Sequence, residues 1–407
     1  MIKIKTNVAM VLSLFILIPF VLNLKASATV ASDELTVNKV TIRCDIGDTG
    51  LIQISLSDEQ SKRILDNTEM GSLVFDLTPI KFTKGFDLTF DPRAFENARI
   101  EEIRIISFPD AELRLDANNL AQLADRASGE KMTLHLEYLD SGTSSQPMKG
   151  VELSAYLKDG TQIDQFGTTN PINITIPYDD FHYNKADLVA VKTSDKENET
   201  IARSMASEKS VILLADRPGK YIITHREPKK FDDLTEEWMS APVNLLSSRK
   251  ITLGVSEHSF APNQGITYAE FLTLFARLLN LPKGTSSNME IPAWAKDTLT
   301  ESNIAFLMQG NNGMQLEIRD ILTRQEMFAI LSVYISVNNV YFSKTDKPLM
   351  FADMESIDEK NKYNIDLLSK MGLIQGDSNN NIRAKDAATR AEAVLVLYKF
   401  LIWSINR

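Results

Sequence analysis

Three short stretches in the last part of the chain decide its fold: Ile266-Thr267-Tyr268-Ala269-Glu270, Leu322-Thr323-Arg324-Gln325-Glu326 and Ala388-Thr389-Arg390-Ala391-Glu392. A glycine precedes each glutamate by the same interval: Gly254 before Glu270, Gly310 before Glu326 and Gly376 before Glu392. The same interval again leads back to Trp238, Trp294 and Lys360. This internal spacing is kept although the copies themselves are unevenly spaced along the chain, which predicts a structural repeat.

Each copy carries Thr-x-x-Glu, the spacing of a capping box at the start of a helix. The threonines are expected to cap the third helical amide, and the glutamates to reach back to the amide of the cap. Apolar residues follow at helical spacing in residues 268–281, 326–337 and 392–402. We therefore predict helices with the caps Thr267 and Glu270, Thr323 and Glu326, and Thr389 and Glu392.

The residue that follows each threonine is the candidate ligand-binding position. Arg324 and Arg390 fall at the first helical residue, where a cation meets the positive end of the helix dipole. Free helix-start amides and a guanidinium could together receive an anion such as a carboxylate. A solvated surface arginine is the alternative interpretation. Tyr268 takes this position in the first copy, which therefore lacks the charge.

These motifs resemble repeats of the S-layer homology (SLH) family, over about 43% of the chain. The predicted repeats are 231–284, 285–340 and 348–407, and the resemblance implies a pseudo-threefold all-α bundle. Their shared elements are Phe231-x-Asp233, Trp238, Gly254 and Phe260-x-Pro262 in the first, Trp294 and Gly310 in the second, and Phe351-Ala352-Asp353 and Gly372 to Gly376 in the third.

The resemblance also implies a function. Proteins of this family bind secondary cell-wall polysaccharides, often capped with pyruvylated sugars, in grooves between repeats. Arg324 and Arg390 would hold the carboxylate of the pyruvyl group. Trp238 and Trp294 fit either stacking on a sugar face or packing in the repeat core. The motif glycines allow either a close approach of ligand to backbone or a tight turn with positive φ. They are Gly254, Gly310 and Gly376.

No copy is complete. Lys360 stands where the other copies have tryptophan, the second copy lacks Phe-x-Asp, and Tyr268 replaces arginine in the first. We therefore expect fewer than three binding grooves. Replacing Arg324 and Arg390 by alanine is expected to abolish co-sedimentation with cell-wall sacculi while the fold stays intact.

Residues 1–28 are typical of a secretory signal peptide. Lys3 and Lys5 precede an apolar run over residues 8–24, and Ala26-Ser27-Ala28 follows it. The alternative is an uncleaved anchor, but this run of about 17 residues is near the lower limit for spanning a membrane. Cleavage would leave no membrane span and 41 basic against 54 acidic residues. Such a balance argues against a nucleic-acid partner.

The strand pattern of residues 29–228 predicts a β-sandwich-like region. Residues 29–140 are predicted to form a β-rich domain, and residues 150–228 a second β-rich domain or a continuation of the first. A helix over residues 117–127 with Asp116 as its cap, and a linker over residues 141–149, complete the prediction. Cys44 is the single cysteine and is expected in a strand. Alternating runs predict strands at 40–43, 51–56, 73–77, 86–90, 103–106, 113–115, 132–138, 151–157, 172–176, 188–192, 211–214 and 221–224.

Catalytic and metal-binding motifs are not found in the sequence. The histidines share no metal-ligand spacing; they are His135, His182, His225 and His258. Asp377-x-Asn379-x-Asn381 resembles the start of a calcium loop, but it lacks the glycine and the final glutamate, which favours a polar turn. We expect no metal, no cofactor and no enzymatic activity.

The sequence as a whole predicts an α+β multidomain protein, secreted and held at the cell wall. Its β-rich region would face outward, as in surface proteins of Paenibacillus-type Gram-positive bacteria, which it weakly resembles. One alternative is a surface enzyme acting on glycans, with two facing carboxylates in the β-rich region. Another is an adhesin, for which exposed aromatic residues on one sheet face would be expected.

Overall fold

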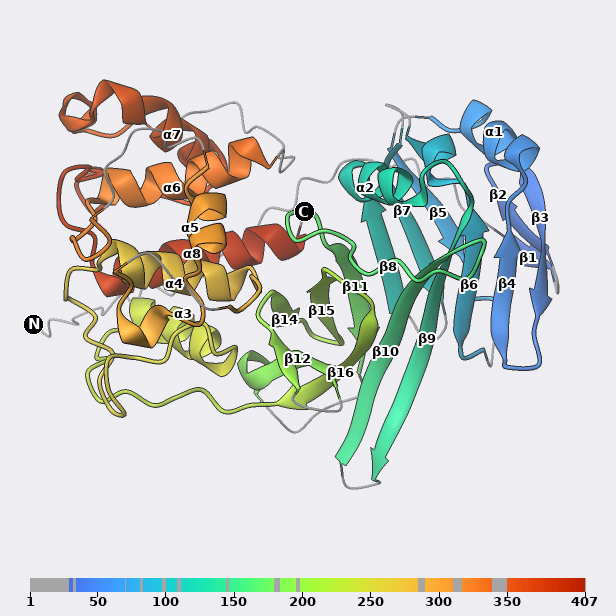
Figure 1. The fold of residues 1–407 in the computed structure, drawn as a ribbon, viewed down its shortest axis with the longest axis horizontal. Helices are drawn as coiled ribbons and strands as arrows, with labels where there is room; N and C mark the ends of the chain where they lie inside the picture. Colours follow the sequence, from blue (N-terminus) through green and yellow to red (C-terminus); the bar gives the residue numbers. More distant parts are fainter. Residues whose placement is uncertain are drawn as a thin grey trace, which may run out of the picture.

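The computed structural model describes residues 29–31, 34–69, 71–80, 83–96, 100–107, 111–143, 146–178, 184–194, 198–284, 290–309, 317–338 and 350–406. The predicted signal peptide, Gly310 and His182 lie outside these residues. The chain has a β-rich part, which includes the long hairpin β9–β10, and a helical part beside it (Figure 1). No described helix is both long and apolar enough to cross a membrane.

Within the described residues, the β-rich part consists of two sheets. The ten-stranded sheet has the order β1-β2-β3-β4-β6-β9-β10-β16-β12-β13, and the six-stranded sheet has the order β14-β15-β11-β8-β7-β5. The pairs β4–β6 and β5–β7 are parallel. The strands are β1 Thr29–Ala31, β2 Glu34–Val37, β3 Val40–Ile46, β4 Leu51–Ser55, β5 Gly71–Asp76, β6 Gly85–Phe90, β7 Ile100–Ser107, β8 Ala111–Asp116, β9 Met132–Thr143, β10 Gln146–Leu157, β11 Ile172–Pro177, β12 Leu188–Thr193, β13 Glu199–Ile201, β14 Ser204–Ala206, β15 Ser210–Ala215 and β16 Gly219–His225.

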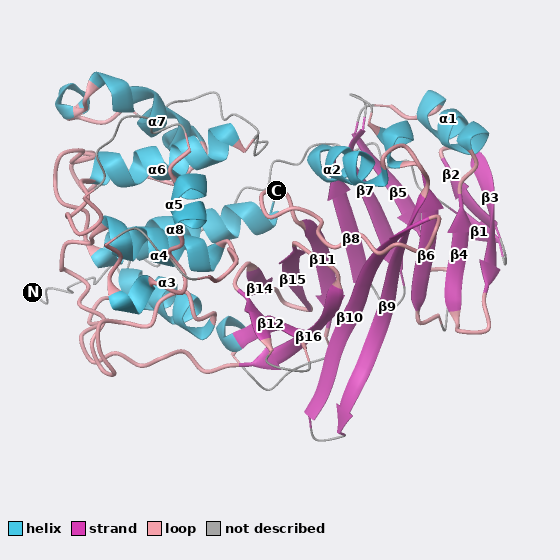
Figure 2. Cartoon of the chain, in the orientation of Figure 1, coloured by secondary structure: helices cyan, strands magenta, loops and turns pink. Residues whose placement is uncertain are grey.

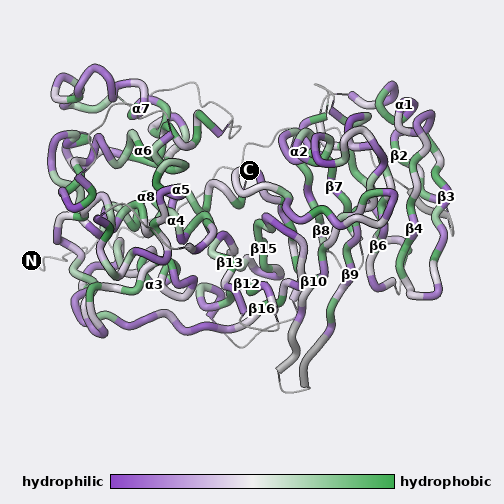
Figure 3. Tube along the Cα trace, in the orientation of Figure 1, coloured by the Kyte–Doolittle hydropathy of each residue, from purple (hydrophilic) through white to green (hydrophobic). Residues whose placement is uncertain are grey.

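The alternating sequence pattern explains how these strands pack. In β8, Ala111, Leu113 and Leu115 are buried, and the residues between them are partly exposed. One face of each such strand is therefore apolar and closes on the other sheet, as in a sandwich. The hydropathy trace shows apolar segments along these strands and along the helices of the other part (Figure 3). The predicted sandwich-like architecture followed by helices is confirmed.

The two predicted β-rich stretches share both sheets and one apolar core. Strand β10 pairs with β9 on one side and with β16 on the other, and β11 pairs with β8. The later stretch is therefore a continuation of the earlier one. The predicted linker at residues 141–149 is wrong, because β9 and β10 pair out to Thr143 and Gln146. A run of small polar residues suits the end of a hairpin as well as it suits a linker.

The helices of the β-rich part follow their capping signals. Helix α2 (Ala117–Ala127) begins after Asp116, whose side chain accepts a hydrogen bond from the Asn119 amide, as predicted. Helix α1 (Asp58–Asp66) was not predicted, although Ser57 and Gln60 form a complete capping box at its start. Cys44 is buried in β3.

The helical part is built from α3 (Glu237–Ser248), α4 (Tyr268–Leu278), α5 (Glu301–Leu307), α6 (Arg324–Val337), α7 (Glu359–Lys370) and α8 (Arg390–Asn406). Helices α4, α6 and α8 begin at the three motifs. Each contributes an aromatic ring to the shared core: the Phe275 centroid lies 5.0 Å from that of Tyr334 and 5.8 Å from that of Phe400. The predicted all-α bundle therefore has one motif helix from each repeat.

The two parts of the chain are joined through buried polar contacts, where β14 and β15 lie beside α8 (Figure 2). Arg249, after α3, is 2% exposed and donates through Nε to the Ser204 carbonyl at 2.7 Å. The Asn173 side chain donates to the Ile405 carbonyl at 3.1 Å. Ala202 and Leu214 of the β-rich part belong to the apolar core of the bundle. The joint is thus packed and hydrogen-bonded from both sides.

Candidate functional site

The three motifs meet and hold one another through their backbones. The Ile266 amide donates to the Ala388 carbonyl at 2.9 Å, the Ala388 amide to the Leu322 carbonyl at 2.8 Å, and the Leu322 amide to the Ile266 carbonyl at 3.0 Å. These hydrogen bonds form a closed triangle of the residues that precede the caps. We use the name helix-start ring for the motif residues that surround this triangle: Thr267, Tyr268, Glu270, Thr323, Arg324, Glu326, Thr389, Arg390 and Glu392.

The first amides of the motif helices are also occupied. Each first helical amide donates to a carbonyl of the next repeat, at 2.9 to 3.0 Å, and each second amide does the same at 2.8 to 3.0 Å. The third amides belong to the capping boxes. The expectation of free amides at the helix starts is therefore wrong. The pairs are Tyr268–Asp320, Arg324–Asp386, Arg390–Gln264, Ala269–Ile318, Gln325–Ala384 and Ala391–Pro262.

The side-chain contacts of the helix-start ring join the repeats in the same order as the contacts of the first helical amides: first to second, second to third and third to first. Arg324 Nη1 lies 2.6 Å from Glu392 Oε1. Arg390 Nη1 lies 2.7 Å from Glu270 Oε1. Tyr268 hydrogen-bonds Glu326. Burial is the main cause that raises the pKa of the Tyr268 hydroxyl, and Glu326 raises it further, so the hydroxyl stays protonated and acts as a donor. Tyr268 thus keeps the link to the next repeat without a charge.

A second contact ties each arginine to a loop of the next repeat. Arg390 Nε donates to the Phe260 carbonyl at 2.9 Å. That loop is held by Asp233, whose carboxylate accepts from the Phe260 amide at 2.9 Å and the Ala261 amide at 2.8 Å. The aspartate of Phe-x-Asp therefore fixes the carbonyl that the arginine uses.

The third repeat shows the same arrangement. Arg324 Nε donates to the Ile382 carbonyl at 2.8 Å, and Asp353 accepts from the amides of Ile382 and Arg383 at 2.7 and 2.8 Å. The second repeat lacks Phe-x-Asp, and the ring residue directed at it is Tyr268. The missing Phe-x-Asp of the second repeat and the replacement of arginine by Tyr268 in the first repeat thus affect the same contact, the one between these two repeats.

Both arginines of the helix-start ring are buried. Their side chains are 9% exposed for Arg324 and 6% for Arg390, and each guanidinium lies over a phenyl ring, Phe328 or Phe260. Burial lowers the pKa of both, against the raising effect of Glu392 and Glu270. The interpretation as solvated surface arginines is wrong. Their role in holding a sugar carboxylate stays a prediction.

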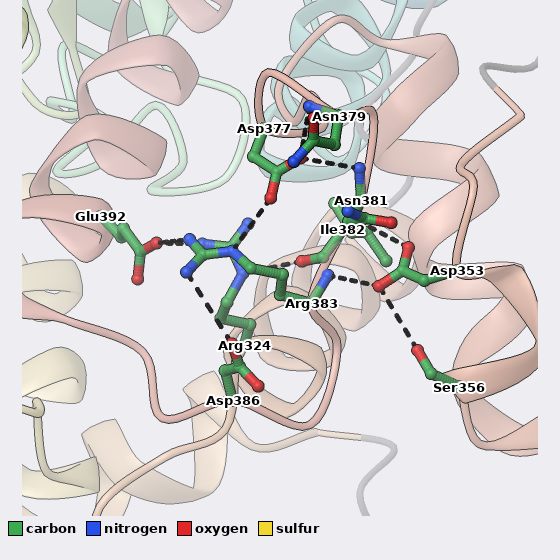
Figure 4. Close-up of polar contacts among 10 residues, drawn as sticks. All are labelled: Arg324, Asp353, Ser356, Asp377, Asn379, Asn381, Ile382, Arg383, Asp386 and Glu392. Atoms are coloured by element: carbon green, nitrogen blue, oxygen red, sulfur yellow. Dashed lines mark hydrogen bonds and ion pairs between the residues drawn. The ribbon is translucent and has the colours of Figure 1, made fainter.

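Glu392 of the helix-start ring contacts two guanidinium groups (Figure 4). Its Oε1 accepts from Arg324 and also from Arg383 Nη2, each at 2.6 Å, and its Oε2 accepts from the Thr389 amide at 2.9 Å. Arg383 also lies 3.8 Å from Asp377 and from Asp386. With three carboxylates around two guanidinium groups, this corner does not favour an added anion.

The polar segment at 377–381 is a turn, as predicted. Asp377 Oδ1 accepts from the amides of Asn379 and Asn381 at 2.9 and 3.0 Å. In the described part of the chain, no group of three or more His, Cys, Asp or Glu residues is placed to hold a metal ion.

The motif tryptophans lie on the surface. Trp238 is 45% exposed and Trp294 is 52% exposed. Trp238 Nε1 donates to Glu236 Oε2 at 2.6 Å, which orients the ring from its edge. The interpretation that both tryptophans pack in the repeat core is therefore wrong. Lys360 replaces this residue in the third repeat.

The described motif glycines have reasons within the fold. Gly254 has φ +74°, and a Cβ there would lie 2.3 Å from the Phe231 ring and 2.7 Å from the Ser259 carbonyl oxygen. At Gly376 a Cβ would lie 2.8 Å from the backbone of Asn380. Gly254 therefore has the positive φ of a tight turn, whereas Gly376 does not and is explained by its close neighbours alone. Contact of these glycines with a ligand stays a prediction.

The β-rich part contains one paired histidine of chemical interest. His135 Nδ1 lies 2.6 Å from Asp87 Oδ1, and Gln53 donates to the other Asp87 oxygen at 2.7 Å. These residues lie side by side on β9, β6 and β4. The hydrogen bond with Asp87 raises the pKa of His135, against the lowering effect of burial. No sequence motif indicated this cluster.

Comparison with known proteins supports the repeat assignment. The family model of the S-layer homology domain matches residues 230–272 and 351–394, which lie in the first and third predicted repeats. The chain thus carries S-layer homology domains in its helical part. Such domains imply anchoring at the cell wall, and the predicted cell-surface location is confirmed.

Curated relatives share this part of the chain. An amylopullulanase of Thermoanaerobacterium thermosulfurigenes is 29% identical over 182 residues, which is 44% of this chain and 10% of the relative. An exoglucanase, XynX, of Acetivibrio thermocellus is 27% identical over 199 residues, 48% of this chain and 18% of the relative. An endo-1,4-beta-xylanase A of Thermoanaerobacterium saccharolyticum is 30% identical over 120 residues, 28% of this chain and 10% of the relative. The chain therefore spans less than a fifth of each relative, within their S-layer homology regions.

Proposed function

We propose that the helical repeats anchor the chain non-covalently to a cell-wall polysaccharide and display the β-rich part outward. The observation that carries this proposal is the exposure of Trp238 and Trp294 at matching positions of the first and second predicted repeats. Tryptophan is enriched at binding interfaces, because its side chain combines a large apolar body with a polar N–H group. An indole offers an apolar face to the C–H groups of a sugar ring and an N–H to a hydroxyl.

The helix-start ring holds the repeats together. Its threonines cap their own helices, and its arginines and glutamates contact one another between repeats, which fixes the helix starts relative to one another. We infer that Arg324 and Arg390 act mainly by positioning the repeats. A pyruvyl carboxylate on the polymer remains the predicted anionic group. Because the third repeat has Lys360 in place of tryptophan, two sugar-stacking positions are expected.

The test is co-sedimentation of the chain with purified cell-wall sacculi. The double variant Trp238→Ala, Trp294→Ala should remain in the supernatant, because its stacking faces are gone. Ile46→Ala is a matched control, since Ile46 is also an exposed large apolar residue, 53% exposed, but lies on β3 of the β-rich part. If the tryptophan variant pellets as completely as the wild-type chain, the proposed role of these residues is wrong.

A glycan-acting enzyme is the second candidate, because the relatives are an amylopullulanase, an exoglucanase and a xylanase. A cavity of about 650 Å³ in the β-rich part is lined in part by Glu137 and Asp140. These carboxylates lie three residues apart on β9, so they point to opposite faces of the sheet and do not form a facing pair. We therefore expect no release of reducing sugar from xylan, β-glucan or pullulan by the full chain. Turnover of any of them would favour the enzyme.

A further inference from the structure

A basic cavity of about 460 Å³ lies at the joint between the β-rich part and the first repeat. One wall comes from β13 and the turn before β16, and the other from the ends of α3 and α4 and the segment at 297–298. Five basic residues face two acidic residues, in a chain whose formal net charge is −10. The basic residues are Arg217, Arg249, Lys250, Arg277 and Lys283, and the acidic residues are Glu199 and Asp297.

Two of the basic residues build the walls. Arg249 donates from Nε to Ser204, from Nη1 to Ala186 and from Nη2 to Leu188, at 2.7 to 3.1 Å and to carbonyl oxygens in each case. Arg217 is paired with Asp216 at 3.1 Å and with Glu199 at 3.0 Å. The charges of these two residues are thus already used in hydrogen bonds and ion pairs that hold the walls of the cavity.

The other three basic residues are held less tightly: Arg277 Nη1 donates to the Ile251 carbonyl at 3.4 Å, which is a long hydrogen bond. Within the described part of the chain, Lys250, Arg277 and Lys283 have no carboxylate oxygen within 4.0 Å of a side-chain nitrogen. Burial lowers the pKa of Arg277, and Asp297 opposes this only through a longer-range attraction. Lys250 has φ +57°, a backbone conformation that glycine or asparagine adopts more readily. The fold therefore holds three cations around one cavity, and none of them forms an ion pair within the described residues.

The walls are fixed relative to each other. The Asn280 side chain, at the end of α4, donates to the Thr200 carbonyl at 2.9 Å and to Glu199 Oε1 at 3.1 Å, and it accepts from the Ala202 amide at 2.9 Å. A ligand would thus enter a site that is already formed, which lowers the cost of ordering it.

We propose that this cavity binds an anionic group carried on a sugar, a carboxylate or a phosphate, between Lys250, Arg277 and Lys283. Charge-assisted hydrogen bonds to such an oxyanion are stronger than neutral ones. The site lies outside the repeated motif and includes the β-rich part, so the ligand would bridge both parts of the chain. It does not depend on the exposed tryptophans or on wall anchoring.

The test uses small sugars as probes, with ligand-induced rise of the unfolding midpoint as the readout. Methyl glucuronide carries a carboxylate, glucose 6-phosphate carries a phosphate, and methyl glucoside carries neither. We expect saturable stabilisation of the full chain by one of the two anionic sugars, at constant ionic strength, and none by methyl glucoside. The sugar that raises the unfolding midpoint shows whether the cavity binds a carboxylate or a phosphate.

The variant Lys250→Ala, Lys283→Ala should bind the active sugar at least about tenfold more weakly. Lys158→Ala, Lys209→Ala removes the same charge from two other exposed lysines, on the β-rich part, and should bind as the wild-type chain does. The proposal is overturned if neither anionic sugar stabilises the wild-type chain, or if both double variants lose binding equally. Because no probe is the wall polymer, these results are independent of co-sedimentation with sacculi.

Discussion

Arg390 and Glu270 form an ion pair of 2.7 Å between the third and the first repeat, although 120 residues separate them in the sequence. Arg324 and Glu392 link the second repeat to the third in the same way. With the Tyr268–Glu326 hydrogen bond, these pairs close the helix-start ring. Since every repeat uses residues of another repeat, we infer that the three repeats fold as one cooperative unit.

The first prediction concerns the two buried arginines. Arg390→Ala should lower the free energy of unfolding by about 3–5 kcal/mol, because it leaves the Glu270 carboxylate without its cationic partner in a buried site. Arg324→Ala should cost less, since Glu392 keeps Arg383 as a partner at 2.6 Å. Denaturant unfolding of the full chain, followed by far-UV circular dichroism, measures the difference.

Arg383→Ala is the control for this comparison. Its side chain is 44% exposed, so its removal alone should change stability by no more than about 1 kcal/mol. The double variant Arg324→Ala, Arg383→Ala should then approach the loss seen for Arg390→Ala. Equal losses for the two single variants Arg324→Ala and Arg390→Ala would contradict this interpretation. The expectation that alanine at both ring arginines leaves the fold intact conflicts with these ion pairs.

The second prediction separates packing from backbone strain at the motif glycine. Gly254→Ala places a methyl group against the Phe231 ring at a positive φ, so it should cost about 2–4 kcal/mol. Gly372 has nearly the same φ, +71°, but a Cβ there would have no neighbouring atom within 4 Å, so Gly372→Ala should cost only about 1 kcal/mol. Thermal unfolding of both variants tests this, and equal losses would show that packing at Gly254 is unimportant.

The helix caps could be predicted from the sequence, and the role of the ring arginines could not. A capping box is complete within one helical turn, so Thr267 and Glu270 carry their own signal. The partners of Arg390 are Phe260 and Glu270, in a repeat far earlier in the sequence. A helix considered alone offers free amides and a free guanidinium. The neighbouring repeat supplies the carbonyls and carboxylates that occupy them.

The β-rich part shows the same limit at the level of strands. The sequence pattern predicted twelve of the strands in the described residues, but it missed the short strands β1, β2, β13 and β14. It could not predict that β10 lies between β9 and β16, or that β5 and β7 are parallel, because strand order depends on contacts distant in the sequence. For this reason the sequence suggested a linker at 141–149 that the structure does not have. For the same reason it left open whether the β-rich region is one domain or two.

The third prediction uses the Asp87–His135 pair. The pKa of His135 is raised by its hydrogen bond with Asp87, so the pair stabilises the fold below the ordinary histidine pKa of about 6.5. This contribution is lost as the pH rises through the raised pKa. Asp87→Asn should therefore lower the His135 titration midpoint, measured from its imidazole signals by NMR. Glu137→Gln, which removes a weaker and more distant attraction, should lower it less; an unchanged midpoint in Asp87→Asn would contradict the assignment.

The fourth prediction concerns Asp233, which holds the loop that Arg390 contacts. Burial acts to raise its pKa, but hydrogen bonds from the Phe260 amide, the Ser259 hydroxyl and the Ala261 amide lower it below the usual range. A carboxyl with a lowered pKa contributes stability that is present above its unfolded pKa of about 3.9 and is lost as the pH falls through the folded value.

Asp233→Asn should therefore lower the free energy of unfolding by on the order of 1 kcal/mol at neutral pH, because an amide oxygen is a weaker acceptor than a carboxylate. The difference from the wild-type chain should shrink as the pH falls below about 4, because the unfolded chain takes up the proton first and folded Asp233 takes it up only at lower pH, where both side chains are uncharged. Urea unfolding at a series of pH values measures this convergence. Asp232→Asn is the matched control, because the neighbouring side chain is exposed and should change stability little at any pH. A difference that stays constant down to the acid limit would mean that Asp233 acts through its shape alone and that its charge does not hold the loop.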